Sequence, residues 1–396
     1  MEPERASSLA VEVSVCRDIR AIPSEEWDAC ACPEETAQGR PVDPFTTHRF
    51  LRALEASDSV SAETGWIAFH LVARQQGSVI AVMPVYAKMH SQGEYVFDHA
   101  WANAFEQAGG RYYPKLQSAV PFTPVTGRRV LARPGFEEMA FPAMLEALKE
   151  LTSSNSLSSA HITFCTAAEA QTGKALGMLV RHGIQFHWEN RRYRSFEEFL
   201  GALTSRKRKN IRRERRLASQ CGGDVELLAG DQIKDRHWDV FWEFYQDTGA
   251  RKWGMPYLTR EFFTEMHRTM RNDILLVMCR IGDEHVAGAL HFIGRDALYG
   301  RYWGCSRFND CLHFELCYYR AIDYAIEKGM SRVEAGAQGP HKLARGYMAT
   351  PTFSLHWMEH EGFRLAMARY LEQETRQVEL ELSAAELAGP FRKDTA

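Results

Sequence analysis

Long apolar runs are missing from this sequence of 396 residues. A helix that crosses a bilayer needs about 18 or more apolar residues in a row, and no such stretch occurs, so we expect no membrane span. An apolar leader is missing as well, because residues 1–10 are polar and include Glu2, Glu4 and Arg5, a pattern unlike that of a signal peptide. These absences predict a cytoplasmic protein.

Patterned cysteines and an excess of positive charge are also lacking. The nine cysteines contain no Cys-x-x-Cys pair, and the spacing of Cys305, Cys311 and Cys317 with His313 matches no zinc pattern. We therefore expect reduced thiols and no metal site. The 48 Lys and Arg residues are balanced by 51 Asp and Glu residues, for a net charge of -3, so any site for a polyanion must be local.

Hydrophobic residues make up 45% of the chain and charged residues 25%, which indicates a soluble globular protein of two to three domains. Segments with strand-like and helix-like periodicity alternate along it. The expected helices span 137–152, 196–219, 236–270, 312–328 and 363–388. The expected hairpins span 66–88 and 274–293, and the other strands span 161–165, 184–189, 297–304, 332–335 and 353–358. This order predicts an α/β (layered α+β) fold with mixed central sheets flanked by helices.

One order of elements occurs twice: a hairpin, a further strand, a helix, a stop of small residues and a strand. The hairpin-first order favours duplication, although any α/β protein shows some alternation. We therefore predict two domains of one ancestry. The first covers residues 1–195 and carries an aromatic insert at 93–130; the second covers 196–396 and carries a basic helix at 205–219.

Several longer segments carry a family likeness. They are Gly93–Asp98 with Trp101, Tyr112–Gln117, Pro121–Gly127, His187–Asn190, Ser205–Lys209, Gly249–Gly254, Tyr299–Gly304, His313–Glu315, and Glu334–Gly339 with His341 and Lys342. Through them the chain resembles, from about residue 45 to 393, the FemAB-like predicted N-acyltransferases of the GNAT superfamily, described as peptidoglycan biosynthesis or recognition proteins. The resemblance implies tandem GNAT-like domains and acyl transfer.

A more distant resemblance is to the Fem aminoacyltransferases, which add amino acids from aminoacyl-tRNA to peptidoglycan precursors. Arg345-Gly346-Tyr347 stands where those proteins carry a Lys-Gly-Phe turn. The chain departs from them in this Arg for Lys and in the short length of any helical arms after the basic segment. The departure weakens the expectation that transfer RNA is the donor.

Acyl transfer to an amine needs a group that takes a proton, a stabiliser of the tetrahedral oxyanion and a grip on the donor. Glu334 ends a strand before a Gly-rich turn, where a carboxylate can act as base, although a surface or ion-paired Glu is an equal alternative. His341 and Tyr302 are the other catalytic candidates, with a core aromatic as the simpler interpretation of Tyr302. We interpret His187 as structural.

Cationic residues supply the candidates for binding the donor. Residues 206–216 contain eight Lys or Arg and one Glu, and because like charges at i,i+4 repel, a phosphate-bearing ligand would offset that repulsion, although a solvated helix remains an alternative. Alternation along the strand predicts Arg301 and Trp303 on one face and Tyr302 on the other. The candidates for substrate or donor binding are Arg206, Lys207, Arg251, Lys252, Trp253, Arg301, Gln338, Lys342 and Arg345, with Asp98, Tyr113 and Lys115 from the aromatic insert.

These interpretations predict an N-acyltransferase with no bound cofactor, which uses acyl-CoA or aminoacyl-tRNA as co-substrate and an amine on a small molecule or cell-wall precursor as acceptor. Two alternatives stay open. One is a non-catalytic binder of peptidoglycan-type precursors built on a degenerate GNAT pair. The other is an RNA-binding module that uses 206–216 and would release its ligand steeply with salt.

Overall fold

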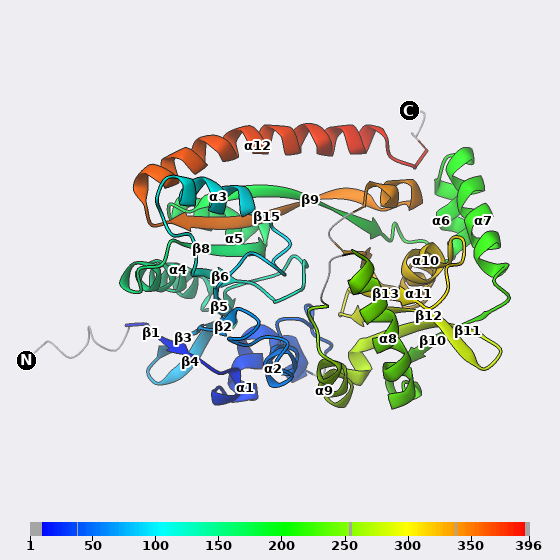
Figure 1. The fold of residues 1–396 in the computed structure, drawn as a ribbon, viewed down its shortest axis with the longest axis horizontal. Helices are drawn as coiled ribbons and strands as arrows, with labels where there is room; N and C mark the ends of the chain where they lie inside the picture. The colour runs from blue at the N-terminus through cyan, green and yellow to red at the C-terminus, as the bar shows by residue number, and fades with distance from the viewer. Residues whose placement is uncertain (1–9, 38, 253–255, 337–338, 393–396) are drawn as a thin grey trace, which may run out of the picture. The chain divides into compact units, whose positions relative to one another are not determined.

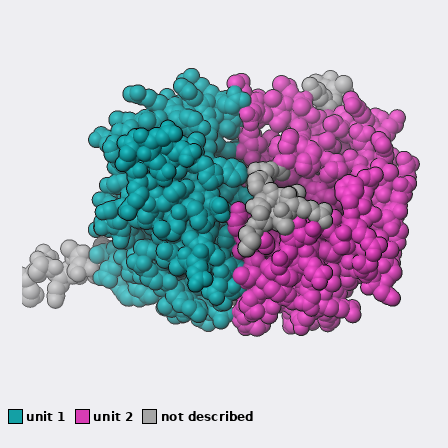
Figure 2. All heavy atoms as spheres, viewed as in Figure 1, with its two compact units in different colours: residues 1–183, 351–379 teal, residues 184–350, 380–396 magenta. Residues whose placement is uncertain are grey.

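The computed structural model describes residues 10–37, 39–252, 256–336 and 339–392. The chain divides into two compact units, which Figure 2 colours separately: unit 1 comprises residues 1–183 and 351–379, and unit 2 comprises residues 184–350 and 380–396. Within the described ranges, none of the helices combines the length and the apolar character that crossing a bilayer requires.

The expected boundary lies at 195/196, whereas the structure divides within two long strands that run from one unit into the other. The second half of β9 (Leu179–Glu189) pairs with β14 (Arg332–Glu334), and the second half of β15 (Met348–Met358) pairs with β8 (Ser159–Cys165). Residues 184–195 therefore belong to unit 2 and residues 351–379 to unit 1. Pairing between strands so far apart in the chain leaves no local signal in the sequence.

Unit 1 contains a four-stranded sheet in the order β1-β3-β4-β7 and a second series of paired strands in the order β2-β5-β6-β8-β15. Its remaining strands are β1 (Glu12–Cys16), β2 (Trp66–Ala68), β3 (His70–Gln75), β4 (Ser78–Met83), β5 (Val85–Lys88), β6 (Lys115–Ser118) and β7 (Leu131–Ala132). Its helices are α1 (Ser24–Ala31), α2 (His48–Ala56), α3 (His99–Gln107), α4 (Glu137–Ser154) and α5 (Ala167–Ala175), and it holds the first part of α12 (Glu361–Leu387) (Figure 1).

The core of unit 1 lies between its strands and α4. Val85 of β5, Leu116 of β6 and Ile162 of β8 point from one face of these paired strands into a single apolar cluster. Met144 and Leu148 of α4 pack against the same cluster. Side chains one residue away point to the opposite face of these strands. Burying a Leu or Met side chain of this kind contributes about 1.5–3 kcal/mol.

Unit 2 contains strands in the order β10-β11-β12-β13-β14-β9, all antiparallel except the parallel pair β13 and β14. The strands are β10 (Asp224–Ala229), β11 (Ile274–Ile281), β12 (Glu284–Ile293) and β13 (Ala297–Cys305). The helices are α6 (Phe196–Ala202), α7 (Ser205–Ser219), α8 (Asp235–Lys252), α9 (Arg260–Met270), α10 (Leu312–Phe314), the π-helix η6 (Glu315–Tyr319), α11 (Arg320–Glu327) and the 3-10 helix η7 (Pro340–Arg345) (Figure 1).

Two expected long helices are each broken in two. The helix expected over 196–219 divides at Leu203 and Thr204, whose backbones are extended, with the amide of Thr204 bonded to the carbonyl of Pro390 at 2.9 Å. The helix expected over 236–270 divides before Pro256, and Thr259 caps the second half through a bond to the amide of Phe262. Proline cannot supply the amide that a continuous helix needs.

The duplicated order of elements is present in both units. In unit 1, β5 and β6 are antiparallel and α4 connects β6 to its parallel neighbour β8. In unit 2, β12 and β13 are antiparallel and α11 lies on the connection from β13 to its parallel neighbour β14. Both units therefore have the mixed sheets flanked by helices that the sequence predicts.

Candidate functional site

A buried carboxylate lies at the end of β14, between β13 and β9 of unit 2. Glu334 is 4% exposed, and its Oε1 accepts a hydrogen bond from Arg332 Nε at 2.8 Å. Its Oε2 lies 3.7 Å from His187 Nε2 and has no hydrogen-bond partner among the described residues. An unsatisfied buried oxygen costs about 1–3 kcal/mol, so a ligand that donates to Oε2 would recover free energy.

The neighbours of Glu334 hold it in place and were not predicted as site residues. Strand pairing sets Glu334 beside His187 on β9 and beside Tyr299 on β13, whose hydroxyl accepts from Arg332 at 3.2 Å. Gln185 Oε1 lies 3.1 Å from His187 Nε2. Burial lowers the pKa of His187, which keeps its imidazole neutral at pH 7. Only the two-residue spacing of Gln185 and His187 in a strand could have indicated that both face Glu334.

Strand β14 ends at Glu334, whereas its neighbour β13 continues. Only Ala297, Leu298 and Tyr299 of β13 pair with β14, although β13 continues to Cys305. Along that edge, no strand of the described chain pairs with residues 300–305. A Cβ on Gly300 would lie 3.6 Å from Cα of Ala335, so the two backbones are still close just after β14 ends. The open edge can receive an extended group that bears amides.

A β-bulge changes which side chains face Glu334. Leu290 pairs with Tyr302 and His291 with Gly300, so Arg301 is an extra residue in β13. The bulge turns Tyr302 to the same face as Tyr299, on which Arg332 and Glu334 also lie. Trp303, which pairs with Ala289, lies on the opposite face from Tyr302 as expected, and strict alternation fails only at the extra residue Arg301 among the described residues of β13. Tyr302 is half-buried, with its ring 5.2 Å from that of Tyr245, and burial raises its pKa, so its hydroxyl keeps its proton at pH 7.

Lys342 provides a buried cation next to the Gly-rich turn. It is 2% exposed, and its Nζ donates to the carbonyl of Gly336 at 2.9 Å. Burial lowers the pKa of Lys342 to about 8, and the charge of Arg301 acts in the same direction. Two cationic side chains, Arg301 and Lys342, therefore influence one another close to the open edge of β13, where an anionic group would be favoured.

The basic helix and the Gly-rich turn meet through one ion pair. Glu214 of α7 accepts from Arg345 of η7 through both carboxylate oxygens, at 2.9 and 3.0 Å, and also from the hydroxyl of Tyr319. The Arg345 guanidinium lies 3.4 Å over the ring of Phe314 and donates to the carbonyl of His341 at 2.7 Å. Arg345, predicted to bind the donor, is thus occupied in joining these two segments.

The cations of α7 fall into two groups. Arg215 is paired with Glu315 at 2.9 Å and Asp323 at 2.8 Å, and it stabilises the packing of α7. In contrast, Arg206, Lys207, Arg208 and Lys209 have no ion-pair partner in the part of the chain that the structure describes. They lie at the start of α7, where the helix dipole disfavours positive charge, so an anion would bind there favourably.

The other site residues predicted in unit 2 either point away from Glu334 or lie outside the residues that the structure describes. His341 is exposed, with its Nε2 3.1 Å from the hydroxyl of Tyr318 and its ring packed against Phe314, so it faces the helices and not Glu334. The side chains of Arg251 and Lys252, and the whole of Trp253 and Gln338, lie outside the described residues.

Unit 1 brings its three predicted residues into one buried cluster. Lys115 Nζ donates to Asp98 Oδ2 at 2.5 Å, to Glu94 Oε2 at 2.8 Å and to Ser91 Oγ at 3.0 Å, and the hydroxyl of Tyr113 lies 2.7 Å from Ser91 Oγ. Lys115 is fully buried. Glu94 was missed because its carboxylate reaches the cluster from a loop 21 residues away. Burial raises the pKa of Glu94 to about 7.

The raised pKa of Glu94 predicts a pH-dependent stability. Between its unfolded pKa near 4.3 and its folded pKa of about 7, the folded chain holds a proton that the unfolded chain releases, so stability falls as pH rises through this window. Relative to the parent, the free energy of unfolding of Glu94→Gln should rise by up to about 3 kcal/mol between pH 4.5 and 8, as measured by urea denaturation. Glu106→Gln, at an exposed position, is the control. If the difference in unfolding free energy between Glu94→Gln and the parent does not change with pH, the pKa of Glu94 is not raised.

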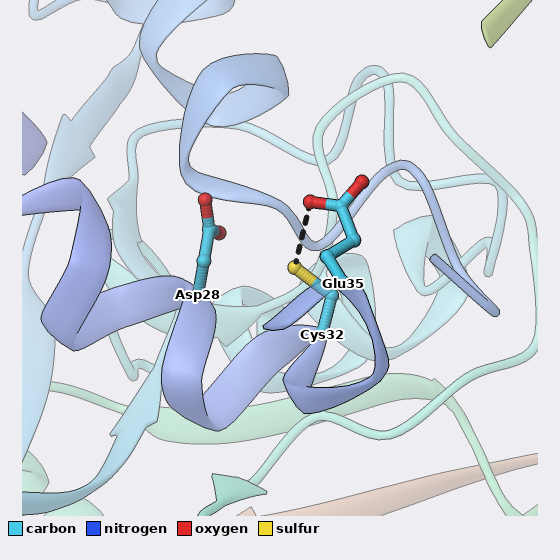
Figure 3. A group of neighbouring side chains, drawn as sticks. All are labelled: Asp28, Cys32 and Glu35. Atoms are coloured by element: carbon cyan, nitrogen blue, oxygen red, sulfur yellow. Dashed lines mark hydrogen bonds between the residues drawn. The ribbon is translucent and has the colours of Figure 1, made fainter. Parts of the chain in front are cut away.

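A third cluster has the composition of a metal site but is satisfied from within. Asp28, Cys32 and Glu35 each offer an atom within 4.8 Å of the others (Figure 3). Both oxygens of Glu35 accept from Arg49 at 2.7 Å, and Asp28 Oδ1 accepts from the amide of His48 at 2.8 Å. Burial raises the pKa of the Cys32 thiol, which keeps its proton and donates to Glu35. We interpret the cluster as structural.

Comparison with known proteins places this geometry in a family. A family model described as FemAB-like, peptidoglycan biosynthesis/recognition, matches residues 18–393. The crystal structure of FemX is similar at a TM-score of 0.54 and 14% identity, covering 88% of this chain and 98% of that chain. The C-terminal domain of a putative lysylphosphatidylglycerol synthetase from Agrobacterium fabrum is similar at 0.51 and 10% identity, covering 87% and 95%.

No curated protein sequence matches the chain significantly. At identities this low, the two solved structures establish a shared fold alone. The family model, in contrast, spans nearly all of the sequence, from just after β1 to beyond the end of α12. The chain therefore belongs to the FemAB-like family.

Proposed function

We propose that the chain is an N-acyltransferase that moves an acyl or aminoacyl group from a thioester or an aminoacyl-tRNA to an amino group. The observation that carries the proposal is that Oε2 of buried Glu334, at the end of β14, has no hydrogen-bond partner among the described residues. Membership of a family described by peptidoglycan biosynthesis or recognition favours an amine on a cell-wall precursor as acceptor, with the cytoplasm as the site of reaction.

Glu334 has the features of a general base in this proposal. Arg332 occupies Oε1, so an acceptor ammonium would bind at Oε2 and lose a proton to it. The amine nitrogen then attacks the acyl carbon, and the carbon–sulfur or carbon–oxygen bond to the donor breaks. As the amide forms, its nitrogen loses a second proton and the departing thiolate or ribose alkoxide gains one. The hydroxyl of Tyr302, on the same sheet face, is a candidate to give its proton to the leaving group and to be reprotonated by the one that the nitrogen loses.

The donor would lie along the open edge of β13. The backbone of residues 301–303 can pair with amides of an extended donor, in the manner of an added strand. Lys342 and Arg301 are positioned to favour the negative charge of an oxyanion or a phosphate. The unpaired cations at the start of α7 are proposed to bind phosphates of the same donor.

Product analysis tests the proposal directly. Purified protein is incubated with candidate amines and either acyl-CoA or aminoacyl-tRNA, and the amide product is sought by mass spectrometry. Turnover that depends on Glu334 supports an enzyme. Tight binding of a cell-wall precursor without any product would instead favour the non-catalytic binder built on the same fold.

The first turn of α7 supplies a test of donor binding. Replacing both exposed cations, Arg206→Gln with Lys209→Gln, is expected to weaken donor binding by about tenfold at low salt, because phosphate contacts are lost. With aminoacyl-tRNA, the slope of log affinity against log salt should also fall by about 1 to 2. The control is Arg369→Gln with Arg376→Gln on α12, also exposed; equal effects in the two double variants would assign the loss to net charge.

A further inference from the structure

One face of the unit 1 strands is polar although it is completely buried. Side chains at alternate positions of β5, β6, β8 and β15 lie on the face opposite the apolar core, and neighbouring strands bring them into register, with Lys88 beside Lys115, and Gln117 beside His161. Each is at most 2% exposed. The set is Tyr86, Lys88, Lys115, Gln117, Ser159, His161, Thr163 and His356.

Polar residues are rarely buried in such numbers without a ligand or a complete set of partners. Here the set of partners is incomplete. Gln117 donates to Thr163 Oγ1 at 3.0 Å, yet its Oε1 accepts nothing, and His356 pairs with His161 at 2.7 Å, yet its Nε2 is unpartnered within the described residues. A structural polar network would be expected to satisfy these atoms.

Two carboxylates cover the same face and are also only half satisfied. Glu94 and Asp98 share the ammonium of Lys115 through one oxygen each, and Glu94 Oε1 and Asp98 Oδ1 have no partner in the described chain. Asp98 precedes α3 in the N-cap position but makes no side-chain cap bond there. A side-chain cap of this kind contributes about 1 kcal/mol to helix stability. Asp98 makes none and instead accepts from Lys115.

The charges of the cluster leave room for one more cation. Two carboxylates face the single ammonium of Lys115, while Lys88 lies apart, donating to the carbonyl of Gln92 at 3.0 Å and resting 3.6 Å above the ring of Trp66. Burial lowers the pKa of Lys88 to about 7 and raises that of Glu94 to about 7. Above pH 7, therefore, Lys88 loses its charge while Glu94 becomes a carboxylate, and positive charge is in short supply. The histidines add none, because burial lowers the pKa of His161 to about 3.

We propose that this cluster is a second ligand site, which binds the primary ammonium group of a small molecule at the carboxylate oxygens of Glu94 and Asp98 that Lys115 leaves free. An ammonium group supplies the missing positive charge and three N–H donors, and the unpartnered acceptors Glu94 Oε1, Asp98 Oδ1 and Gln117 Oε1 are equal to them in number. Anions are disfavoured by the two carboxylates. The site goes beyond the proposed acyl transfer, since it uses no residue of the Glu334 site.

The test uses methylammonium as the smallest probe with this chemistry. Isothermal titration calorimetry of the full chain at pH 8, with potassium and tetramethylammonium chloride at equal ionic strength as comparison ions, reports binding without any assay of transfer. We expect saturable binding of methylammonium and at least about tenfold weaker binding of tetramethylammonium, which has the charge but no N–H donor.

Variants locate the site. Glu94→Gln and Asp98→Asn are each expected to weaken methylammonium binding by about tenfold or more, whereas Glu106→Gln, on the exposed side of α3, should leave it unchanged. Circular dichroism confirms that each variant is folded, and the comparison of ions in the parent chain needs no variant. Absence of saturable binding, equal binding of potassium or tetramethylammonium, or undiminished binding in folded Glu94→Gln would overturn the proposal.

Discussion

Glu334→Gln is expected to lower kcat/KM for acyl transfer by about 10²–10⁴, the usual contribution of a positioned general base. Glutamine preserves the shape of the side chain and can still accept from Arg332, whose bond to Oε1 is 2.8 Å. The change removes the ability to accept the amine proton at Oε2. Initial rates of amide formation, measured by mass spectrometry over a range of acceptor concentrations, check this expectation.

Glu327→Gln is the matched control for that experiment. Glu327 ends α11 in the same unit, but its side chain is 67% exposed and paired only with the neighbouring Lys328. Its replacement should leave kcat/KM unchanged. Equal turnover by Glu334→Gln and the parent would remove Glu334 from the mechanism and leave the open edge of β13 without a base.

Glu214→Gln is expected to destabilise the protein by about 3 kcal/mol, because it leaves the buried guanidinium of Arg345 without its counter-ion. Arg345 has a side chain only 8% exposed, and both oxygens of Glu214 bind it. The lost ion pair is the one that joins α7 to η7, so the substitution weakens the packing of these two helices. Urea denaturation followed by circular dichroism measures the change in unfolding free energy.

An exposed ion pair beside the same helix provides the comparison. Glu197 binds Arg212 with side chains 68% and 55% exposed, so Glu197→Gln should change stability by less than about 1 kcal/mol. If Glu214→Gln proves no more disruptive than Glu197→Gln, the ion pair between Glu214 and Arg345 does not join α7 to the Gly-rich turn.

Features with local periodicity were predictable from the sequence, and features that depend on pairing at a distance were not. The basic segment 205–219 is helical as predicted, because helical periodicity is local, but the break at Leu203 and Thr204 inside the helix expected over 196–219 was not predicted. The extra residue at Arg301 that turns Tyr302 toward Glu334 depends on the register of β12 against β13, which no local pattern contains. For the same reason the sequence did not indicate that His187 lies beside Glu334, because the two paired residues are 147 positions apart in the chain.

The buried polar face of unit 1 is an intermediate case. Alternation of polar and apolar residues in β8, from Ser159 through His161 to Thr163, is visible in the sequence and is typical of a strand with one solvated face. The structure differs in that both faces are buried. Sequence analysis assigned Asp98, Tyr113 and Lys115 to a common insert, but only the structure gives Lys115 its two carboxylate partners.

The role of Glu334 as proton acceptor is tested most directly by acceptors that differ in basicity. Hydroxylamine is unprotonated at pH 7, whereas an alkylamine is almost fully protonated and must lose its proton in the active site. If Glu334 takes that proton, the loss of rate in Glu334→Gln should be large with the alkylamine and shrink by at least about tenfold with hydroxylamine. An equal loss with both acceptors would contradict the assignment.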